Sequence, residues 1–104
     1  MCGISGFYDI EAKYLDESLG LVTKMSDQIT HRGPDNQGIW LSDNKKLAFA
    51  HQRLSILDLS SEGNQPMHSS SGRYVIAFNG EIYNYVELKK ILNLRQWRGS
   101  SDTE

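Results

Sequence analysis

The fold class of this chain is indicated most clearly by one short segment, Arg73-Tyr74-Val75-Ile76-Ala77-Phe78-Asn79-Gly80. Larger apolar side chains alternate with smaller ones from Tyr74 to Phe78, and this period of two predicts a strand with one buried face. Asn79-Gly80 is the strongest short-range signal for a tight turn, so the strand is predicted to end there. Residues 85–92 then carry apolar side chains at helical spacing, and Asn84 is the expected N-cap.

Another helix is predicted nearer the start of the chain. Apolar side chains recur at intervals of three and four between Leu15 and Thr30, which is the period of an amphipathic helix. The loop His31-Arg32-Gly33-Pro34-Asp35 should end this helix. The residue before a proline is displaced from the helical region, and Gly33 permits a positive φ.

The remaining segments are interpreted as antiparallel β-structure and loops. Residues 38–41 and 47–54 hold strand-forming side chains on either side of the turn-like segment 42–45, which predicts a hairpin. Residues 60–72 are polar, contain a proline and lack periodicity, so a long ordered loop is predicted. The run 95–98 is not predicted to be a strand. The predicted class is therefore α+β, with mostly antiparallel strands.

Length and composition limit the classes of protein to be considered. The 104 residues suffice for one domain, and 38% hydrophobic with 23% charged side chains is typical of a globular chain. The formal net charge of -2 removes the electrostatic case for binding nucleic acid or an acidic membrane. No apolar run approaches the ~20 residues that span a bilayer, and no secretory signal is recognisable. A soluble, cytoplasmic protein is therefore expected.

Cys2 attracts attention because it follows the initiator Met1 and is the single cysteine. A lone cysteine cannot form an internal disulfide, which agrees with a reducing compartment. Removal of Met1 is expected before so small a residue, and it would leave a free α-amine beside the thiol. An α-amine of pKa about 7.7–8.0 and a thiol of pKa about 8.5 can act as base and nucleophile near neutral pH. The alternative is that a small residue stands here by chance.

Several short motifs follow one another along nearly the whole chain: Cys2-Gly3-Ile4-Ser5-Gly6-Phe7, His31-Arg32-Gly33-Pro34-Asp35, His51-Gln52-Arg53-Leu54-Ser55-Ile56, Asn64-Gln65-Pro66-Met67, Asn79-Gly80-Glu81-Ile82-Tyr83-Asn84 and Ser101-Asp102-Thr103-Glu104. Together they resemble the class II glutamine amidotransferase domain of asparagine synthetases, a family of N-terminal-nucleophile hydrolases. The resemblance implies part of a four-layer αββα sandwich of antiparallel sheets. Residues 1–104 would form the N-terminal portion of that domain, incomplete at its C-terminus.

The resemblance also assigns roles in the hydrolysis of glutamine. Cys2 would be the nucleophile, and the Asn79 side chain with the Gly80 backbone N–H would form the oxyanion hole. Arg53 would hold the α-carboxylate of glutamine, a task that suits a planar guanidinium. Arg32 would support the site without a specific chemical step. The alternative for Asn79-Gly80 is an ordinary turn.

Four further residues would surround the amino-acid end of the substrate. Glu81 and Asp102 would receive its α-ammonium group, and Leu54 and Ile56 would lend backbone groups. Structural explanations compete with each role, because Leu54 and Ile56 suit core packing and an Asp beside a helix start is favoured by the helix dipole. A strand-end residue such as Arg53 is otherwise most often a solvated surface charge.

No metal or cofactor is expected for this chain. Its histidines, His31, His51 and His68, are scattered at spacings that match no compact zinc pattern. ATP and Mg would be required only by a synthetase domain, which has no counterpart in these residues, and a phosphate-binding GxxxxGK loop is also missing from the sequence.

Two functional hypotheses from different classes remain. Ser101-Asp102-Thr103-Glu104 has the form of a capping box, which predicts the start of a helix and suggests a fragment. In the first hypothesis the chain hydrolyses glutamine to glutamate and ammonia, which would supply an ATP-dependent amide transfer to aspartate in a full-length parent. In the second it is a catalytically inactive, truncated fragment that acts at most as a folding or dimerisation module. A homodimer, or association through the surfaces of a missing half, is expected.

Overall fold

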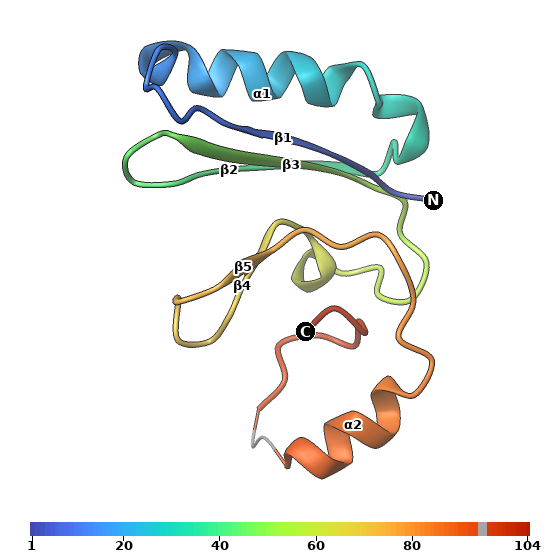
Figure 1. Ribbon diagram of the computed structural model, residues 1–104. Coiled ribbons are helices and arrows are strands. Elements are labelled where there is room, and N and C mark those ends of the chain that lie inside the picture. The colour runs from blue at the N-terminus through green and yellow to red at the C-terminus, as the bar shows by residue number, and fades with distance from the viewer. Residues whose placement is uncertain (94–95) are drawn as a thin grey trace.

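The computed structural model describes residues 1–93 and 96–104 (Figure 1). Within them lie two α-helices and two antiparallel sheets, together with short 3-10 turns at Leu15–Glu17, Thr30–Arg32 and Ser61–Gly63. The strands and helices are, in chain order, β1 (Gly3–Tyr8), α1 (Ser18–Asp27), β2 (Asn36–Leu41), β3 (Leu47–Arg53), β4 (Met67–His68), β5 (Val75–Ile76) and α2 (Tyr85–Leu92).

The larger sheet has the strand order β1-β3-β2, with β3 in the centre. Gly3 of β1 lies opposite Gln52 of β3, and Asn36 of β2 lies opposite Arg53. This register places Cys2, the residue directly before β1, beside the end of β3. The N-terminus of the chain and the residues that follow β3 therefore meet at one end of the sheet (Figure 1).

Helix α1 covers one face of this sheet (Figure 1). Val22 of the helix and two small residues of β3, Ala48 and Ala50, are fully buried between the two layers. Gln52 crosses the same interface, where its Nε2 donates to the Ser26 hydroxyl at 3.0 Å. The edges of this small core are closed by three partly buried apolar residues, Phe7, Ile39 and Leu41.

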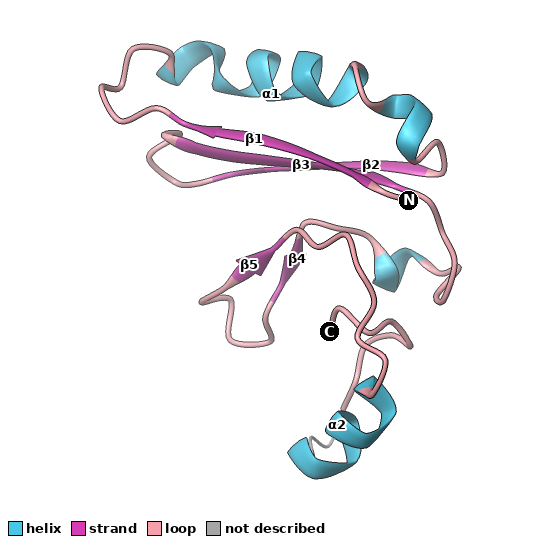
Figure 2. Cartoon of the chain, turned by 45° about the vertical axis from the view of Figure 1, so that its right-hand side comes forward, coloured by secondary structure: helices cyan, strands magenta, loops and turns pink. Residues whose placement is uncertain are grey.

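The opposite face of the sheet is turned toward the rest of the chain. Side chains alternate along a strand, so His51 and Arg53 point away from α1 while Gln52 points toward it. The β4–β5 ribbon lies on that opposite side, and α2 lies beyond it (Figure 2). Gly38 of β2 meets this second part closely, because a Cβ there would overlap the backbone carbonyl of Gln65.

The structure confirms both predicted helices and the hairpin. Helix α1 occupies the middle of the predicted range 15–30, and the 3-10 turns fill its ends. Strands β2 and β3 pair as predicted, and α2 begins directly after Asn84. The Asn84 side chain, however, makes no capping hydrogen bond with the described residues. The α+β class with antiparallel sheets is confirmed.

The predicted strand over 73–79 and the predicted loop over 60–72 are both corrected. Only Val75–Ile76 forms a strand, and its partner β4 lies inside the supposed loop, which also contains a 3-10 turn. Beyond Ile76 the backbone leaves the sheet because Phe78 is hydrogen-bonded to side chains instead of a neighbouring strand. Asn79-Gly80 consequently does not close a hairpin, and the chain continues toward α2.

Two segments have a local backbone geometry that the sequence patterns do not specify. Gly33 has a φ of -159°, which is extended, and glycine is needed there because a Cβ would collide with the carbonyl of Gln52. Residues 101–104 contain no helical turn, and Glu104 does not bond back to Ser101 as in a capping box. The Glu104 carboxylate instead accepts the backbone N–H groups of Arg98 at 2.7 Å and Gly99 at 2.9 Å, so it folds back onto the preceding segment.

Of the run 95–98, Arg95 lies outside the described residues, and residues 96–98 carry no strand. No helix of the described residues combines the length and the apolar character needed to cross a membrane.

Candidate active site

A cavity of about 390 Å³ opens where the end of the large sheet meets the segments 78–81 and 101–103. Its wall contains nearly every residue that the sequence analysis assigned to a site. These residues are Cys2, Arg53, Leu54, Ile56, Asn79, Gly80, Glu81 and Asp102. The structure thus gathers into one place side chains that are separated by up to the whole length of the chain.

Cys2 is held at this cavity by hydrogen bonds at its backbone and at its thiol. The Leu54 N–H donates to the Cys2 Sγ at 3.3 Å, and the thiol lies 3.6 Å from the Leu54 carbonyl oxygen. Arg32 does not line the cavity, but its Nε donates to the Cys2 carbonyl at 3.2 Å. Met1, which precedes Cys2, is 75% exposed.

Arg53 is buried, with 7% of its surface exposed, which contradicts the alternative of a solvated surface charge. Its Nη1 donates at 2.7 Å to the Ser60 carbonyl and at 2.7 Å to Asn64 Oδ1, and its Nη2 donates to the Asp58 carbonyl. A Cβ on Gly63 would strike the guanidinium, so a glycine is required beside it.

The donors of Arg53 that remain free are those that a carboxylate needs. A guanidinium has five N–H groups, and the described residues accept three of them. The remaining donors are the Nε–H and one Nη2–H, and neighbouring donors of one guanidinium are the kind of pair that binds a carboxylate. Arg53 can therefore hold an anionic group in the cavity while its other edge stays anchored to the protein.

The acidic wall of the cavity is formed by Glu81 and Asp102. Asp102 Oδ2 accepts the backbone N–H of Ile82 at 2.8 Å, which ties the segment after Gly80 to the segment 101–103. Glu81 is exposed. The cavity wall thus combines the buried guanidinium of Arg53 with the carboxylates of Glu81 and Asp102.

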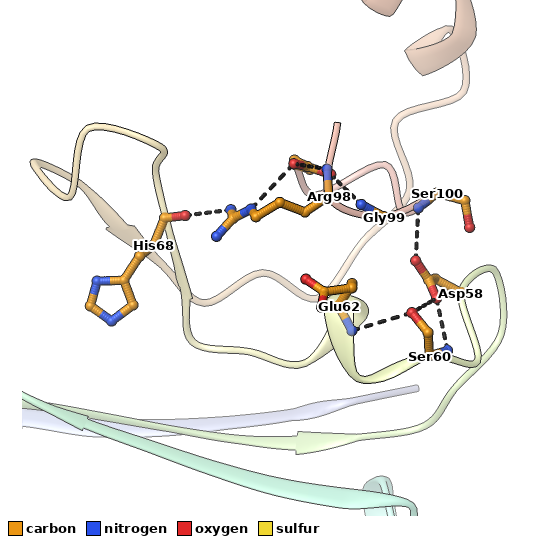
Figure 3. A network of polar contacts seen from close by, with 8 residues as sticks. Asp58, Ser60, Glu62, His68, Arg98, Gly99 and Ser100 are labelled. Atoms are coloured by element: carbon orange, nitrogen blue, oxygen red, sulfur yellow. Dashed lines mark hydrogen bonds and ion pairs between the residues drawn. The ribbon is translucent and has the colours of Figure 1, made fainter. Parts of the chain in front are cut away.

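A network centred on Asp58 joins the two sides of the cavity (Figure 3). Its Oδ1 accepts the hydroxyl of Ser60 at 2.6 Å and the N–H of Ser60 at 2.8 Å, while Oδ2 accepts the N–H of Ser100 at 2.7 Å. These hydrogen bonds, that from the Ser60 hydroxyl above all, hold the pKa of Asp58 well below its usual range. Because the Asp58 carbonyl also accepts from Arg53, one residue connects the anchored guanidinium with the loop that leads to Asp102.

Two further residues of the cavity wall received no role from the sequence. His51 and Gln65 are both buried, and both are hydrogen-bonded to the backbone of Phe78, directly before Asn79. Burial lowers the pKa of His51, and the nearby charge of Arg53 acts in the same direction. In the sequence, His51 stands out only as one of three scattered histidines whose spacings match no compact zinc pattern. No cluster of three potential ligand side chains occurs in residues 1–93 and 96–104.

The whole chain is similar in sequence to a known protein family. A family model described as the glutamine amidotransferase domain matches residues 1–104. The chain belongs to this family. Its amidotransferase domain is 41% identical over 105 residues to the glutamine-hydrolyzing asparagine synthetase 2 of Bacillus subtilis, covering 100% of this chain and 14% of that protein.

Two other relatives also extend far beyond the segment that matches this chain. The glutamine-hydrolyzing asparagine synthetase B of Escherichia coli is 41% identical over 105 residues, with 100% of this chain and 18% of the relative covered. Amidase chry2 of Gibberella zeae is 40% identical over 116 residues, with 100% and 17% covered. The chain thus spans less than a quarter of the length of these relatives.

Proposed function

We propose that the cavity binds glutamine and hydrolyses its side-chain amide, with Cys2 as the nucleophile. The observation that carries this proposal is the convergence of Cys2, the anchored Arg53 and Asp102 on one cavity in a chain of the amidotransferase family. Removal of Met1 is the first requirement, because the nitrogen of Cys2 is otherwise a peptide amide without a basic lone pair.

The binding step follows from the charges of the wall. The α-carboxylate of glutamine would lie on the free fork of Arg53, and its α-ammonium group would face Glu81 and Asp102. Leu54 and Ile56 would line the path of the side chain with backbone groups. This placement directs the side-chain amide toward Cys2, directly before β1.

The chemical step would then need only groups of this chain and water. The α-amine of Cys2 takes the thiol proton, the thiolate attacks the amide carbon, and the oxyanion is stabilised by the Asn79 side chain and the Gly80 N–H. Collapse of the intermediate breaks the C–N bond, and ammonia leaves with the proton from the α-amine. Water then hydrolyses the glutamyl thioester, which releases glutamate and restores the thiol.

We further propose that the ammonia serves an ATP-dependent conversion of aspartate to asparagine in the full gene product. The names of the Bacillus and Escherichia relatives, glutamine-hydrolyzing asparagine synthetases, support this destination. ATP and Mg would then be bound outside residues 1–104. The reaction is placed in the cytoplasm, where a free thiol remains reduced.

The order helix α1, large sheet, β4–β5 ribbon and helix α2 is the order of layers in a four-layer αββα sandwich (Figures 1 and 2). We propose that residues 1–104 form the N-terminal portion of such a domain. Further strands would widen the short β4–β5 ribbon, and the apolar side of α2 would be covered.

A second candidate function is a non-catalytic association module. None of the residues of α2 is buried, and Val86, Ile91 and Leu92 are all exposed on it. Exposed apolar side chains gathered on one helix favour association. In this case the chain would form a homodimer and would not hydrolyse glutamine.

Glutamate release by the full gene product, measured together with the intact mass of its N-terminus, separates these functions. The wild type is expected to lack Met1 and to hydrolyse glutamine, and Cys2→Ala should abolish hydrolysis while glutamine binding stays measurable. Asn79→Ala should cost about 2.7–4 kcal/mol of transition-state stabilisation. Arg53→Lys should raise KM markedly, because a point charge cannot replace the fork.

Two results would contradict the enzymatic proposal. A product that retains Met1 throughout would exclude Cys2 as an N-terminal nucleophile. Full turnover by Asn79→Ala would remove that residue from the oxyanion site. For the 104-residue chain alone, we expect activity far below that of the full product and self-association in sedimentation. Full activity from a monomer would show that these residues already form a complete site.

A further inference from the structure

The residue before the proposed oxyanion site is held in an unusual way. Phe78 lies beyond the end of β5 at Ile76, so its peptide groups have no strand partner. Its N–H donates to the side-chain oxygen of Gln65 at 2.6 Å, and its carbonyl oxygen lies 3.3 Å from Nε2 of His51. Two side chains therefore replace the sheet hydrogen bonds at the point where the backbone turns toward Asn79.

Both side chains are themselves fixed. His51 is 1% exposed and belongs to β3, where it pairs with Ile4 on one side and Gly38 on the other. The backbone of β3 is held on both sides by hydrogen bonds to β1 and β2, so the Cα of His51 has little freedom to move. The imidazole of His51 is therefore fixed by β3, the same strand that carries Arg53.

Gln65 is 7% exposed and is held at its amide nitrogen as well as at its oxygen. Its Nε2 donates to the Thr103 hydroxyl at 3.2 Å, and its backbone carbonyl touches Gly38. The amide thus spans the gap between Phe78 and the segment next to Asp102. It connects the oxyanion side of the cavity with the acidic side.

We propose that His51 and Gln65 are positioning residues, which fix the peptide of Phe78 and thereby aim the Asn79 side chain and the Gly80 N–H at the developing oxyanion. This inference rests on the proposed glutamine hydrolysis and assigns it two further residues. Oxyanion donors stabilise a transition state only when they are oriented before the reaction, since reorientation would consume the energy that they contribute.

The tautomer of His51 follows from its partner. A carbonyl oxygen only accepts hydrogen bonds, so Nε2 carries the proton and donates it to Phe78. Nδ1 is then the unprotonated nitrogen, and it is buried without a hydrogen-bond partner among the described residues. A buried polar atom left unpaired costs stability, so Nδ1 offsets part of what the contact of Nε2 with Phe78 contributes.

The inference can be tested by steady-state kinetics of glutamine hydrolysis in the full gene product. His51→Leu and Gln65→Met remove the contacts to Phe78 with little change in volume. Each should lower kcat by up to about 100-fold, the effect of misplacing a catalytic group by about an ångström. In His51→Leu, KM for glutamine should change little, because Arg53 holds the α-carboxylate independently. His51→Gln, which retains a donor at a similar reach, should recover most of the lost kcat.

A matched control is provided by Gln52 in the same strand. It is also buried and also bonds across an interface, but it points toward α1 and away from the cavity. Gln52→Leu should lower the unfolding temperature without changing kcat. Equal losses of kcat in Gln52→Leu and His51→Leu would show that His51 acts only through stability, and this would overturn the inference.

A double-mutant cycle with Asn79→Ala adds a second measurement. If His51 acts through the oxyanion donors, His51→Leu should lower kcat by a much smaller factor in the Asn79→Ala background than in the wild type. Independent, multiplicative losses would contradict the inference. Gln65→Met carries the same test if His51→Leu does not fold.

Failure of this inference is distinguishable from failure of the proposed function. An inactive wild type, or an active Cys2→Ala variant, would refute glutamine hydrolysis by Cys2 itself. A wild-type enzyme that is impaired by Asn79→Ala but unaffected by His51→Leu and Gln65→Met would refute the positioning role alone.

Discussion

The chain has two regions that are ordered by different interactions. In residues 1–53, long strands and α1 enclose a core in which Val22, Ala48 and Ala50 are fully buried. In residues 54–104, the strands are short, α2 buries no residue, and polar side chains bind backbone groups of distant loops. Asp58 and Gln65 are the principal examples.

The difference teaches how the candidate site is assembled. The first region supplies Cys2 and Arg53 from the ends of neighbouring strands, where sheet hydrogen bonds define their positions. The second supplies Asn79, Gly80 and Asp102 from segments without regular structure. Such segments hold a precise geometry only through specific hydrogen bonds, so polar substitutions in the second region should affect the site as strongly as core substitutions affect the fold.

The largest expected effect on stability comes from the core of the first region. Val22→Ala removes two methyl groups from a fully buried site and should lower the free energy of unfolding by about 2–3 kcal/mol. Ile91→Ala in α2, where the side chain is 77% exposed, should change it by no more than about 0.5 kcal/mol. Urea unfolding of both variants provides the comparison, and equal losses would show that α2 is packed as tightly as α1.

The contact between the two regions can be disturbed at Gly38. A Cβ at this position would lie 2.8 Å from the carbonyl carbon of Gln65 and 3.2 Å from Pro66 Cδ, so Gly38→Ala should destabilise the chain by about 1–3 kcal/mol. It should also displace Gln65 and reduce glutamine hydrolysis. Gly20→Ala in α1 is the control, because nothing lies within 4 Å of its added Cβ, and at this exposed helical position the chain should gain about 0.5–1 kcal/mol of stability. Unaltered stability of Gly38→Ala would mean that the two regions do not touch there.

Acid should loosen the second region through Asp58. Its pKa is lowered in the folded chain by the hydrogen bonds from Ser60 and Ser100. The unfolded chain therefore binds the proton more readily, and the stability contributed by the carboxylate is present above its ordinary pKa of about 3.9 and is lost as the pH falls below it. Thermal unfolding between neutral and acidic pH should show a steeper decline for the wild type than for Asp58→Asn. Parallel curves would exclude this carboxylate as an acid-sensitive link.

The smallest effect is expected from the ionisation of His51. Burial lowers its folded pKa, so the unfolded chain binds more protons once the pH drops below the ordinary histidine value of about 6.5. The contribution of neutral His51 to stability is complete above that pH and diminishes as the pH falls toward the folded pKa. His51→Gln should flatten the stability curve in this window while changing little at pH 8. A wild-type curve that stays level below pH 6 would contradict the expectation.

Sequence patterns predicted the first region better than the second. Helical and strand periods identified α1, the β2–β3 hairpin and α2, because each of these elements is defined by hydrogen bonds between near neighbours in the chain. The alternation from Tyr74 to Phe78 was equally regular, yet only Val75–Ile76 pairs as a strand. Alternation predicts an extended backbone, but pairing also requires a partner segment at the right register, and the partner here is a two-residue strand within an apparent loop.

For the candidate site, the motifs were enough to name the residues. All of the predicted site residues except Arg32 line the cavity, and Arg32 contacts the backbone of Cys2. The sequence was enough to indicate the family and the candidate nucleophile Cys2. Both depend on which residue types follow one another along the chain, and this order can be read without the fold. Their catalytic roles remain predictions for the experiments above.

Only the tertiary structure decided that Arg53 is buried with one free edge, that His51 and Gln65 both hold the peptide of Phe78, and that Asp58 joins two loops. These contacts join residues 27, 13 and 42 positions apart. Separations of that kind leave no period in the sequence, because they are set by how the loops close over the sheet. A polar residue in an aperiodic segment looks the same whether it faces water or supports a backbone turn, and only the packing around it distinguishes the two.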